Sequence, residues 1–411
     1  MKKVIKICSV TMLTLFVLSF VLIPNSAYAE QQAKAKKVKI GWLVATTGVA
    51  AGLTPDGIAA AKLAIDKIEK TGGWLGAGAE LIIRDDKLNP EIAARGAREL
   101  IEVDKVDVLM GAYSSSVALA VSEVAKELKF PFICMGGKTD KLTEENFHPY
   151  VFRIASTATI EGRGAAEVAA ELLKGKKAPK VSVVSWDYEY GHSVWDAFAL
   201  WIKKLIPDVS IPYEAWTKAG EQEYGPHIEA LLGHKPDLVL SLIWAGGIPT
   251  FVSQAKGYKF FEKTTMVLGA EGVSTDYMRQ IGKEWPEGMW GNTYDVHFLP
   301  DTPYHKEWVE DLKAATKTWP PSGAAIESYL PVLFYGRAVQ KAKSTEPQAI
   351  IKALEDLEID TPIGKQTMRA CDHQANRGQV WGKTKFDPAL GFNILTEAKY
   401  VPAEKNWKSC E

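Results

Sequence analysis

The sequence predicts an α/β protein with two doubly wound lobes, each built on a parallel β-sheet. Three observations lead to this fold class. From residue 38 onward, short apolar runs alternate with stretches whose apolar residues recur at helical spacing. The runs are apolar throughout rather than at every second position, as in strands that helices cover on both faces. The alternation restarts after residue 157, which predicts a second lobe.

The first series begins with the apolar run at residues 38–45, which predicts a buried strand. A helix is expected at 56–70, where Ile58, Ala61, Ile65 and Ile68 share one face. Further strands of this series are expected at 80–84, 106–110 and 131–135, and further helices at 90–103 and 117–128.

The second series begins after residue 157, and a Gly- and Pro-containing break at residues 175–179 follows its first helix. Its strands are expected at 181–186, 210–215, 237–244 and 265–268. Its helices are expected at 159–173, 193–205, 224–232 and 249–256. The strands and helices therefore alternate in both halves, as the doubly wound fold requires.

The composition is that of an ordinary globular protein. The 411 residues include 49 Lys and Arg against 50 Asp and Glu, a net charge of −1, and 46% are hydrophobic. This balance argues against disorder, and it lacks the basic surplus typical of nucleic-acid binding. No nucleic-acid partner is therefore expected.

The first 29 residues predict a cleaved signal peptide. Lys2, Lys3 and Lys6 precede an apolar run at residues 7–23, and a small-x-small site ends at Ala29. The alternative is an uncleaved membrane anchor, because a run of this length almost suffices to span a bilayer. Cleavage predicts a periplasmic protein.

Three cysteines remain after that cleavage. Cys134 lies in an apolar run and is expected in the core. Cys371 and Cys410 both lie near the C-terminus of a protein bound for an oxidising compartment, so we expect a disulfide between them. The alternative is two unpaired thiols, since sequence gives no distance.

The loops that follow the expected strands are the candidate ligand site, because ligands bind at the carboxyl ends of strands in open parallel sheets. These loops carry hydroxyls, glycines, one lysine, acidic groups and aromatic residues. They are residues 46–48, 113–116, 136–139, 186–191, 244–247 and 269–272. Such a mixture suits a small polar molecule with an apolar part.

Known catalytic signatures fail on this sequence. The glycines at 76 and 78 precede a strand, the phosphate-loop pattern lacks its first glycine, and the near match to a nucleophile elbow at 191–195 lacks its last one. No metal-binding His or Cys spacing occurs. His373, beside Asp372, is interpreted as a structural histidine rather than a general base. We therefore expect no enzyme, no metal and no cofactor.

The loop sequences resemble those of type I periplasmic binding proteins from branched-chain amino acid ABC transporters. The similarity is carried, in order, by residues 46–48, 111–116, 136–142, 150–153, 190–191, 269–273 and 368–374. It implies two Rossmann-like lobes joined by three crossings. Lobe 1 is expected at 38–157 plus 297–361, and lobe 2 at 158–296 plus 362–411. It also implies a monomer that delivers a small molecule to permease subunits.

The resemblance implies roles for several residues. The loops at 114–116 and 138–139 are expected to hold a ligand carboxylate, and Glu271 to hold its ammonium group, beside an aromatic side of the pocket. The candidate ligand-binding residues are Thr47, Tyr113, Ser114, Ser115, Ser116, Gly137, Lys138, Thr139, Trp186, Tyr188, Tyr190, Trp244 and Glu271.

Each of these assignments has a structural alternative. Ser115 and Ser116 are also suited to capping the helix that follows them. Lys138 can point to solvent, Glu271 can be a solvated loop carboxylate, and most of the tryptophans must be core residues.

The leading hypothesis is capture of an amino acid between the two lobes for import. The alternatives are a binding protein for aromatic or other small carboxylates, since the candidate loops are rich in aromatic residues, and a ligand-sensing receptor module.

Overall fold

The first β-sheet has five parallel strands in the order β2-β1-β3-β4-β5. The structure of the protein is a computed structural model, which describes residues 36–405 and 410. Its strands are β1 (Val38–Val44), β2 (Ala79–Asp85), β3 (Val108–Gly111), β4 (Phe132–Cys134) and β5 (Val151–Arg153). The helical segments between them are η1 (Ala51–Leu53), α2 (Thr54–Lys70), α3 (Pro90–Glu102), α4 (Ser115–Leu128) and η2 (Asp140–Thr143).

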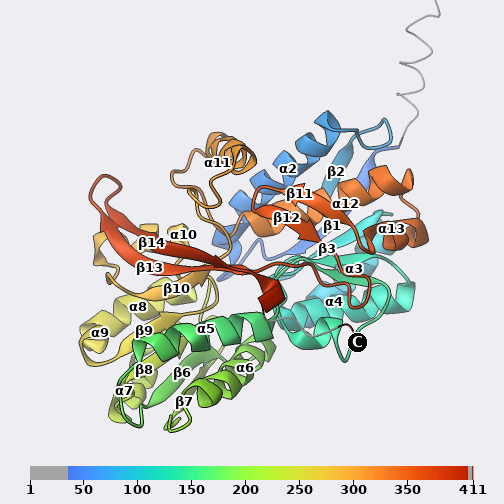
Figure 1. The fold of residues 1–411 in the computed structure, drawn as a ribbon. Helices are drawn as coiled ribbons and strands as arrows, with labels where there is room; N and C mark the ends of the chain where they lie inside the picture. Colours follow the sequence, from blue (N-terminus) through green and yellow to red (C-terminus); the bar gives the residue numbers. More distant parts are fainter. Residues whose placement is uncertain (1–35, 406–409, 411) are drawn as a thin grey trace, which may run out of the picture. The chain divides into compact units, whose positions relative to one another are not determined.

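Helices cover both faces of this sheet. Val108 and Met110 of β3 pack in one apolar cluster, whereas Leu109 between them packs in another. Successive side chains of a strand point to opposite faces, so each face has its own core. One core also receives side chains from α12 (Ile326–Ala342), which lies against α2 although the two are far apart in sequence (Figure 1).

The second sheet has seven strands in the order β14-β13-β10-β9-β8-β6-β7. They are β6 (Val181–Trp186), β7 (Glu214–Thr217), β8 (Leu238–Ser241), β9 (Thr265–Leu268), β10 (Trp290–Thr293), β13 (Gln379–Asp387) and β14 (Phe392–Val401). Its helices are α5 (Ala158–Leu172), α6 (Glu189–Leu205), α7 (Gly225–Gly233), α8 (Gly247–Gly257), α9 (Phe260–Lys263) and α10 (Thr275–Ile281), with η3 (Gly282–Glu284) and η4 (Ala403–Lys405).

The remaining elements follow β10. They are α11 (Pro303–Thr316), α12, α13 (Pro347–Leu354) and a hairpin of β11 (Glu358–Thr361) and β12 (Gly364–Thr367). The three helices pack with the first sheet. The predicted fold class, two lobes with doubly wound sheets, is confirmed, and the chain passes between the lobes three times: after β5, after β10 and after β12.

Some boundaries of the predicted elements differ from the structure. The strand expected at 210–215 is shifted to β7, because Pro212 has no N–H to donate and only Ser210 forms an isolated bridge before it. β13 pairs with β10 and β14 in antiparallel fashion, whereas the sequence predicted parallel strands only. The loop after β4 leads into the short 3₁₀ helix η2.

The residue limits of the two lobes remain a prediction. Its first lobe ends at residue 361. Met368 and Ala375, which lie beyond that limit, pack in the core of the first sheet. Only from Gln379 onward does the chain join the second sheet.

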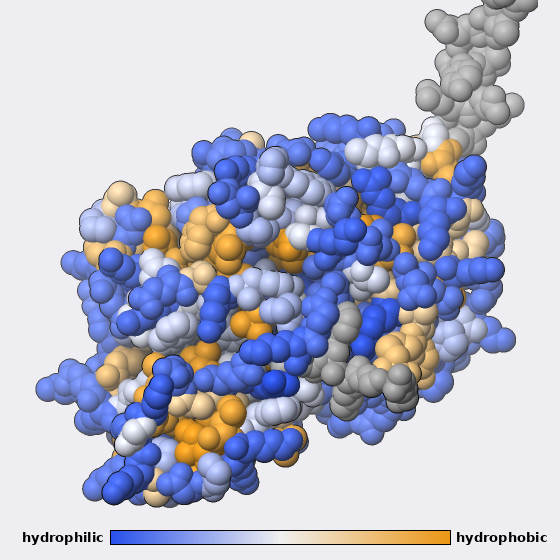
Figure 2. Space-filling model, viewed as in Figure 1, coloured by the Kyte–Doolittle hydropathy of each residue, from blue (hydrophilic) through white to orange (hydrophobic). Residues whose placement is uncertain are grey.

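Hydrophilic residues surround separate groups of apolar ones on the face shown in Figure 2. Within residues 36–405, no helix has the length and apolar character needed to cross a bilayer. The predicted signal peptide at 1–29 lies outside the described residues.

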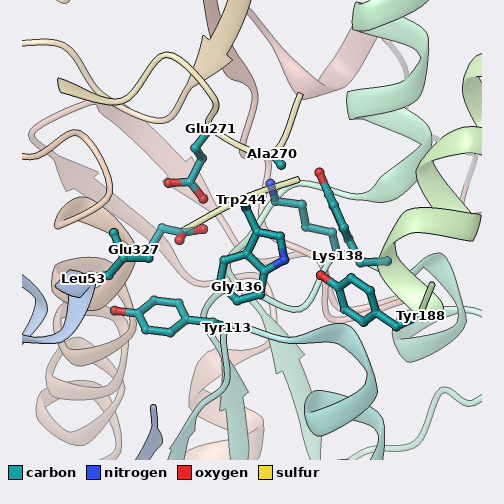
Figure 3. Close-up of a pocket in the computed structure, with 10 residues that line it drawn as sticks. Leu53, Tyr113, Gly136, Lys138, Tyr188, Trp244, Ala270, Glu271 and Glu327 are labelled. Atoms are coloured by element: carbon teal, nitrogen blue, oxygen red, sulfur yellow. The ribbon is translucent and has the colours of Figure 1, made fainter. Parts of the chain in front are cut away.

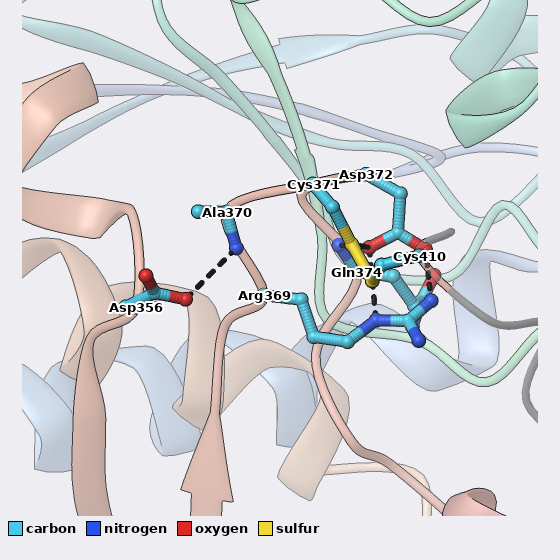
Figure 4. Close-up of a disulfide and its surroundings, with 7 residues drawn as sticks. All are labelled: Asp356, Arg369, Ala370, Cys371, Asp372, Gln374 and Cys410. Atoms are coloured by element: carbon cyan, nitrogen blue, oxygen red, sulfur yellow. Dashed lines mark hydrogen bonds and ion pairs between the residues drawn. A yellow bond between two sulfur atoms is a disulfide. The ribbon is translucent and has the colours of Figure 1, made fainter.

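A disulfide bond joins Cys371 and Cys410, the pair expected from the sequence (Figure 4). Cys371 lies in the turn that follows β12. An ion pair between Arg369 and Asp372 holds this turn, and the Asp372 Oδ1 accepts the Gln374 N–H at 3.1 Å. Cys134 is an unpaired, buried thiol in β4. The disulfide therefore ties the C-terminal end of the chain to the third passage between the lobes.

Reduction of this disulfide should destabilise the protein. The bond closes a loop with a sequence separation of 39 residues. Opening a loop of that size releases unfolded-state entropy worth about 3 to 4 kcal/mol. We expect a reductant to lower the melting temperature of the wild type and to leave the Cys371→Ser/Cys410→Ser double variant unchanged. A thiol titration of the unfolded, unreduced mature protein should find one thiol, and a result of three would contradict the bond.

Close packing of α5 against α6 gives a second prediction. A Cβ added at Gly162 of α5 would lie 2.6 Å from the Val194 carbonyl oxygen and 2.7 Å from the Ala197 Cβ. Gly162→Ala should therefore cost about 1 to 3 kcal/mol of unfolding free energy through overpacking. The matched control is Gly233→Ala at the end of α7, where nothing lies within 4 Å. Urea denaturation that gave equal stabilities for both variants would disprove this packing argument.

Candidate functional site

A cavity lies between the carboxyl ends of the two sheets. The centres of water-sized molecules can occupy about 30 Å³ of it. The residues that line it are Leu53, Tyr113, Gly136, Lys138, Tyr188, Tyr190, Trp244, Ala270, Glu271 and Glu327 (Figure 3). They follow β3 and β4 of the first sheet and β6, β8 and β9 of the second, with additions from η1 and α12. This is the position at which doubly wound sheets bind ligands.

Aromatic rings form one part of the cavity lining. Tyr113 from the first lobe lies edge-on to Trp244 from the second, with ring centroids 6.5 Å apart. Tyr188 and Tyr190 are 5.9 Å apart. Trp186 lies 5.4 Å behind Trp244 and donates its indole N–H to the Tyr224 hydroxyl, so it supports the lining from within the core.

A buried ion pair beside the cavity joins the two lobes. Lys138 of the loop after β4 donates from its Nζ to the Glu161 Oε2 of α5 at 2.8 Å, and both side chains are almost fully buried. The Glu161 Oε1 accepts the Tyr190 hydroxyl and the Ala270 N–H, each at 2.6 Å. Burial raises the pKa of Glu161, but the charge of Lys138 and these hydrogen bonds outweigh it and hold the pKa below its usual value. Glu161 is therefore ionised, and both of its oxygens accept hydrogen bonds.

Two further acidic groups, Glu271 and Glu327, lie against each other, and a side-chain hydrogen bond from one to the other acts to lower the pKa of Glu327. Figure 3 shows their carboxylates facing each other. Among the residues that the structure describes, neither the Glu271 Oε2 nor the Glu327 Oε1 has a hydrogen-bond partner, although both atoms are buried. Burial, followed by the charge of the neighbouring carboxylate, raises the pKa of Glu271. Burial likewise raises the pKa of Glu327, to about 7, against the opposing charges of Arg377 and Lys138.

Arg377 is the second cation near the cavity. Its side chain is fully buried, and its guanidinium carbon lies 4.4 Å from the centre of the Tyr294 ring. Within the described part of the chain, none of its side-chain nitrogens has a hydrogen-bond partner. It does not line the cavity, but its charge acts on Glu327 and Glu271.

The structure places six of the predicted ligand-binding residues at the cavity: Tyr113, Lys138, Tyr188, Tyr190, Trp244 and Glu271. Trp186 stands behind this lining. Thr47 is exposed and donates to Asp85 Oδ2 at 2.5 Å, next to a different pocket. Ser114 is the N-cap residue of α4, and Ser116, in its first turn, does not line the cavity.

Ser115, Gly137 and Thr139 hold the loop after β4 in place and do not line the cavity. The Ser115 Oγ accepts the N–H groups of Lys138 and Thr139 at 3.1 and 3.2 Å. The Thr139 hydroxyl donates to Glu189 at 2.7 Å. A Cβ on Gly137 would lie 2.5 Å from the Ala118 Cβ, so a glycine allows this loop to approach α4 closely. These residues shape the loop that carries Lys138.

Sequence reasoning missed Glu327, Glu161 and Arg377. Glu327 is one acidic residue in an otherwise apolar helical stretch, which was a usable signal. Glu161 occurs in the first turn of a helix, where acidic residues are common for reasons of the helix dipole alone. Gly136 and Ala270 adjoin predicted residues, whereas Leu53 belongs to η1, which contains none of them. No cluster of three or more metal-ligating side chains occurs in the described ranges.

Residues 37–382 match the model of the periplasmic binding protein family. The chain belongs to this family, the solute-binding components of ABC transporters, which act outside the cytoplasm.

Relatives agree with that assignment. The chain is 25% identical over 366 residues to Leu/Ile/Val-binding protein homolog 8 of Brucella abortus, covering 86% of this chain and 89% of that protein. It is 24% identical over 349 residues to the leucine-, isoleucine-, valine-, threonine- and alanine-binding protein of Pseudomonas aeruginosa, covering 84% and 89%. Its fold is similar to that of a solute-binding protein from Rhodopseudomonas palustris solved with 3,4-dihydroxybenzoic acid. The TM-score is 0.78 at 22% identity, over 89% of this chain and 97% of that one.

The raised pKa of Glu327 predicts how the stability of the empty protein depends on pH. The folded state keeps the Glu327 proton up to about pH 7, whereas the usual value is 4.5. Because the folded state then binds more protons than the unfolded one, unfolding free energy should fall as pH rises from 5 to 8. Glu327→Gln should remove up to roughly 3 kcal/mol of this fall, as thermal denaturation at each pH can measure.

The control for this experiment is Glu310→Gln, at an exposed carboxylate of α11. It should keep the wild-type dependence on pH. A Glu327→Gln protein whose stability follows pH as steeply as the wild type would contradict the assignment.

Proposed function

We propose that the protein captures a small molecule whose cationic nitrogen lies at Glu271, and releases it to the permease of an ABC importer. One observation carries this proposal: Glu271, at the carboxyl end of β9, presents an unpartnered carboxylate oxygen beside an aromatic lining. A buried carboxylate without a cation is unfavourable, and a cationic ligand removes that cost. The α-ammonium group of an amino acid is one such nitrogen, in keeping with the names of the relatives.

Closure of the lobes follows from where the lining residues come from. Tyr113 and Lys138 belong to the first lobe, whereas Tyr188, Trp244 and Glu271 belong to the second. A ligand that contacts both sets binds the closed form better than the open one, and this difference in affinity drives closure. Three connecting segments provide the hinge.

The route to the site of action is also part of the proposal. Residues 1–29 act as a signal peptide that is cleaved on export to the periplasm, and the mature protein works as a monomer. The permease subunits receive the ligand unchanged, which excludes catalysis from the role of this chain.

A second candidate is an aromatic acid. Four aromatic residues at the cavity favour it, as does the ligand of the Rhodopseudomonas palustris structure. In that case, Lys138 rather than Glu271 would contact the charged group of the ligand.

The test is a matched pair of ligands on a Glu271 variant. Glu271→Gln keeps the size of the side chain but removes its charge, so affinity for an amine-bearing ligand should fall at least 10-fold, and affinity for its deaminated analogue should hardly change. Calorimetric titration of both ligands with both proteins measures this. Equal losses for the two ligands would refute the role of Glu271, and stronger binding of the deaminated compound by the wild type would favour the aromatic-acid candidate.

A further inference from the structure

Lys138 and the backbone of its loop, which are expected to receive a ligand carboxylate, already have partners in the empty cavity. Lys138 is bound to Glu161 at 2.8 Å. The backbone N–H groups of Lys138 and Thr139 donate to the Ser115 Oγ, and that serine is almost fully buried. A ligand carboxylate at this place would have to displace Glu161 from three further donors, the Tyr190 hydroxyl, the Ala270 N–H and the Gln379 side-chain amide.

On the acidic side of the cavity, in contrast, two carboxyl groups are not fully hydrogen-bonded. Glu271 and Glu327 each have a buried oxygen without a partner among the described residues. An ammonium group placed between Glu271 and Glu327 would supply the opposite charge that these two buried carboxyl groups lack, and would favour their ionised forms. A zwitterion would also bring a carboxylate close to two acidic groups.

The aromatic lining suits a cation as well. Tyr113, Tyr188, Tyr190 and Trp244 contribute rings around the same cavity as the two carboxylates. Faces of such rings attract ammonium groups, including quaternary ones that cannot donate a hydrogen bond. Lys138 already makes two contacts of this kind, with the Tyr294 and Tyr190 rings at 4.4 and 5.4 Å.

We propose that the ligand is a small organic monocation without a free carboxylate group, an amine or a quaternary ammonium compound. Its nitrogen lies between Glu271 and Glu327, and its apolar part lies against the aromatic rings. This inference rests on the proposed function and narrows it, because it excludes zwitterionic amino acids as the preferred ligands. Arg377 does not offer a carboxylate site, since it is fully buried and does not line the cavity.

The experiment compares compounds that share one carbon skeleton. For the wild type, the probes are 2-phenylethylamine, L-phenylalanine and 3-phenylpropionate, then 3-methylbutylamine, L-leucine and 4-methylpentanoate, and finally choline against glycine betaine. Dissociation constants come from calorimetric titration, with the rise in melting temperature as a second measure. In at least one set, we expect the cation to bind 10-fold or more tightly than the zwitterion, and in no set the reverse.

The outcomes separate this inference from the proposed function. If the amino acids bind more tightly than their amines, the monocation inference is wrong and the role of Glu271 stands. If the carboxylates bind most tightly, both are wrong. If neither the amines nor choline bind, the monocation inference is wrong as well.

Variants test the two carboxylates and the internal ion pair. Glu327→Gln should weaken the preferred cation at least 10-fold. Glu161→Gln leaves Lys138 without its partner, so it should strengthen the binding of the zwitterion and the carboxylate relative to the cation. The control is Glu310→Gln at an exposed carboxylate of α11, which lies outside the cavity and should leave the order of affinities unchanged. If Glu327→Gln retained the wild-type affinity for the cation, the inference would be overturned.

Discussion

The ion pair between Lys138 and Glu161 organises the centre of this protein. Two charges removed from water carry a large desolvation cost, which only close contact and further hydrogen bonds repay. Here the carboxylate receives donors from α6, from the loop after β9 and from β13, in addition to the lysine. The pair therefore links segments of both lobes at one point. Loss of either partner would leave the other charged, buried and unpaired.

This pair also decides which chemistry remains open to a ligand. A lysine bound to an internal carboxylate is a poor receptor for a second one. Burial raises the pKa of the neighbouring Glu271, and the charge of Glu327 raises it further. Such an arrangement is expensive for an empty protein, and binding sites are where such costs are usually found. The charged groups at this cavity thus fall into two sets. Lys138 and Glu161 bind each other, whereas Glu271 and Glu327 each keep a buried oxygen without a partner among the described residues.

Sequence patterns could predict the parts of the fold and site that depend on local order. Continuous apolar runs identify β1, β3, β6 and β8, and the loops that follow such strands necessarily meet at one edge of a sheet. This is why the sequence could predict that Tyr113, Lys138, Trp244 and Glu271 lie at the cavity. Glu327 and Arg377 could not be placed this way. They reach the site from a helix and a connecting segment whose positions depend on how the chain returns between lobes.

The strands β13 and β14 were not among the predicted elements, which ended at residue 268, so their antiparallel pairing was missed with them. Direction within a sheet depends on where the preceding connection ends, and a strand pattern carries no sign of direction. Similarly, Ser115 has the sequence features of a helix cap or a ligand contact. Only the fold reveals that its hydroxyl binds two amides of a neighbouring loop.

The disulfide between Cys371 and Cys410 has a practical consequence for how the protein is handled. The bridge holds Cys410 beside the turn that leads into the third passage between the lobes, so a surface linker placed next to Cys410 would lie beside this turn as well. Immobilisation on a biosensor chip through such a linker would load the segment that bends in the proposed closure. Attachment through an engineered cysteine on an outer helix would leave the movement of the lobes unhindered.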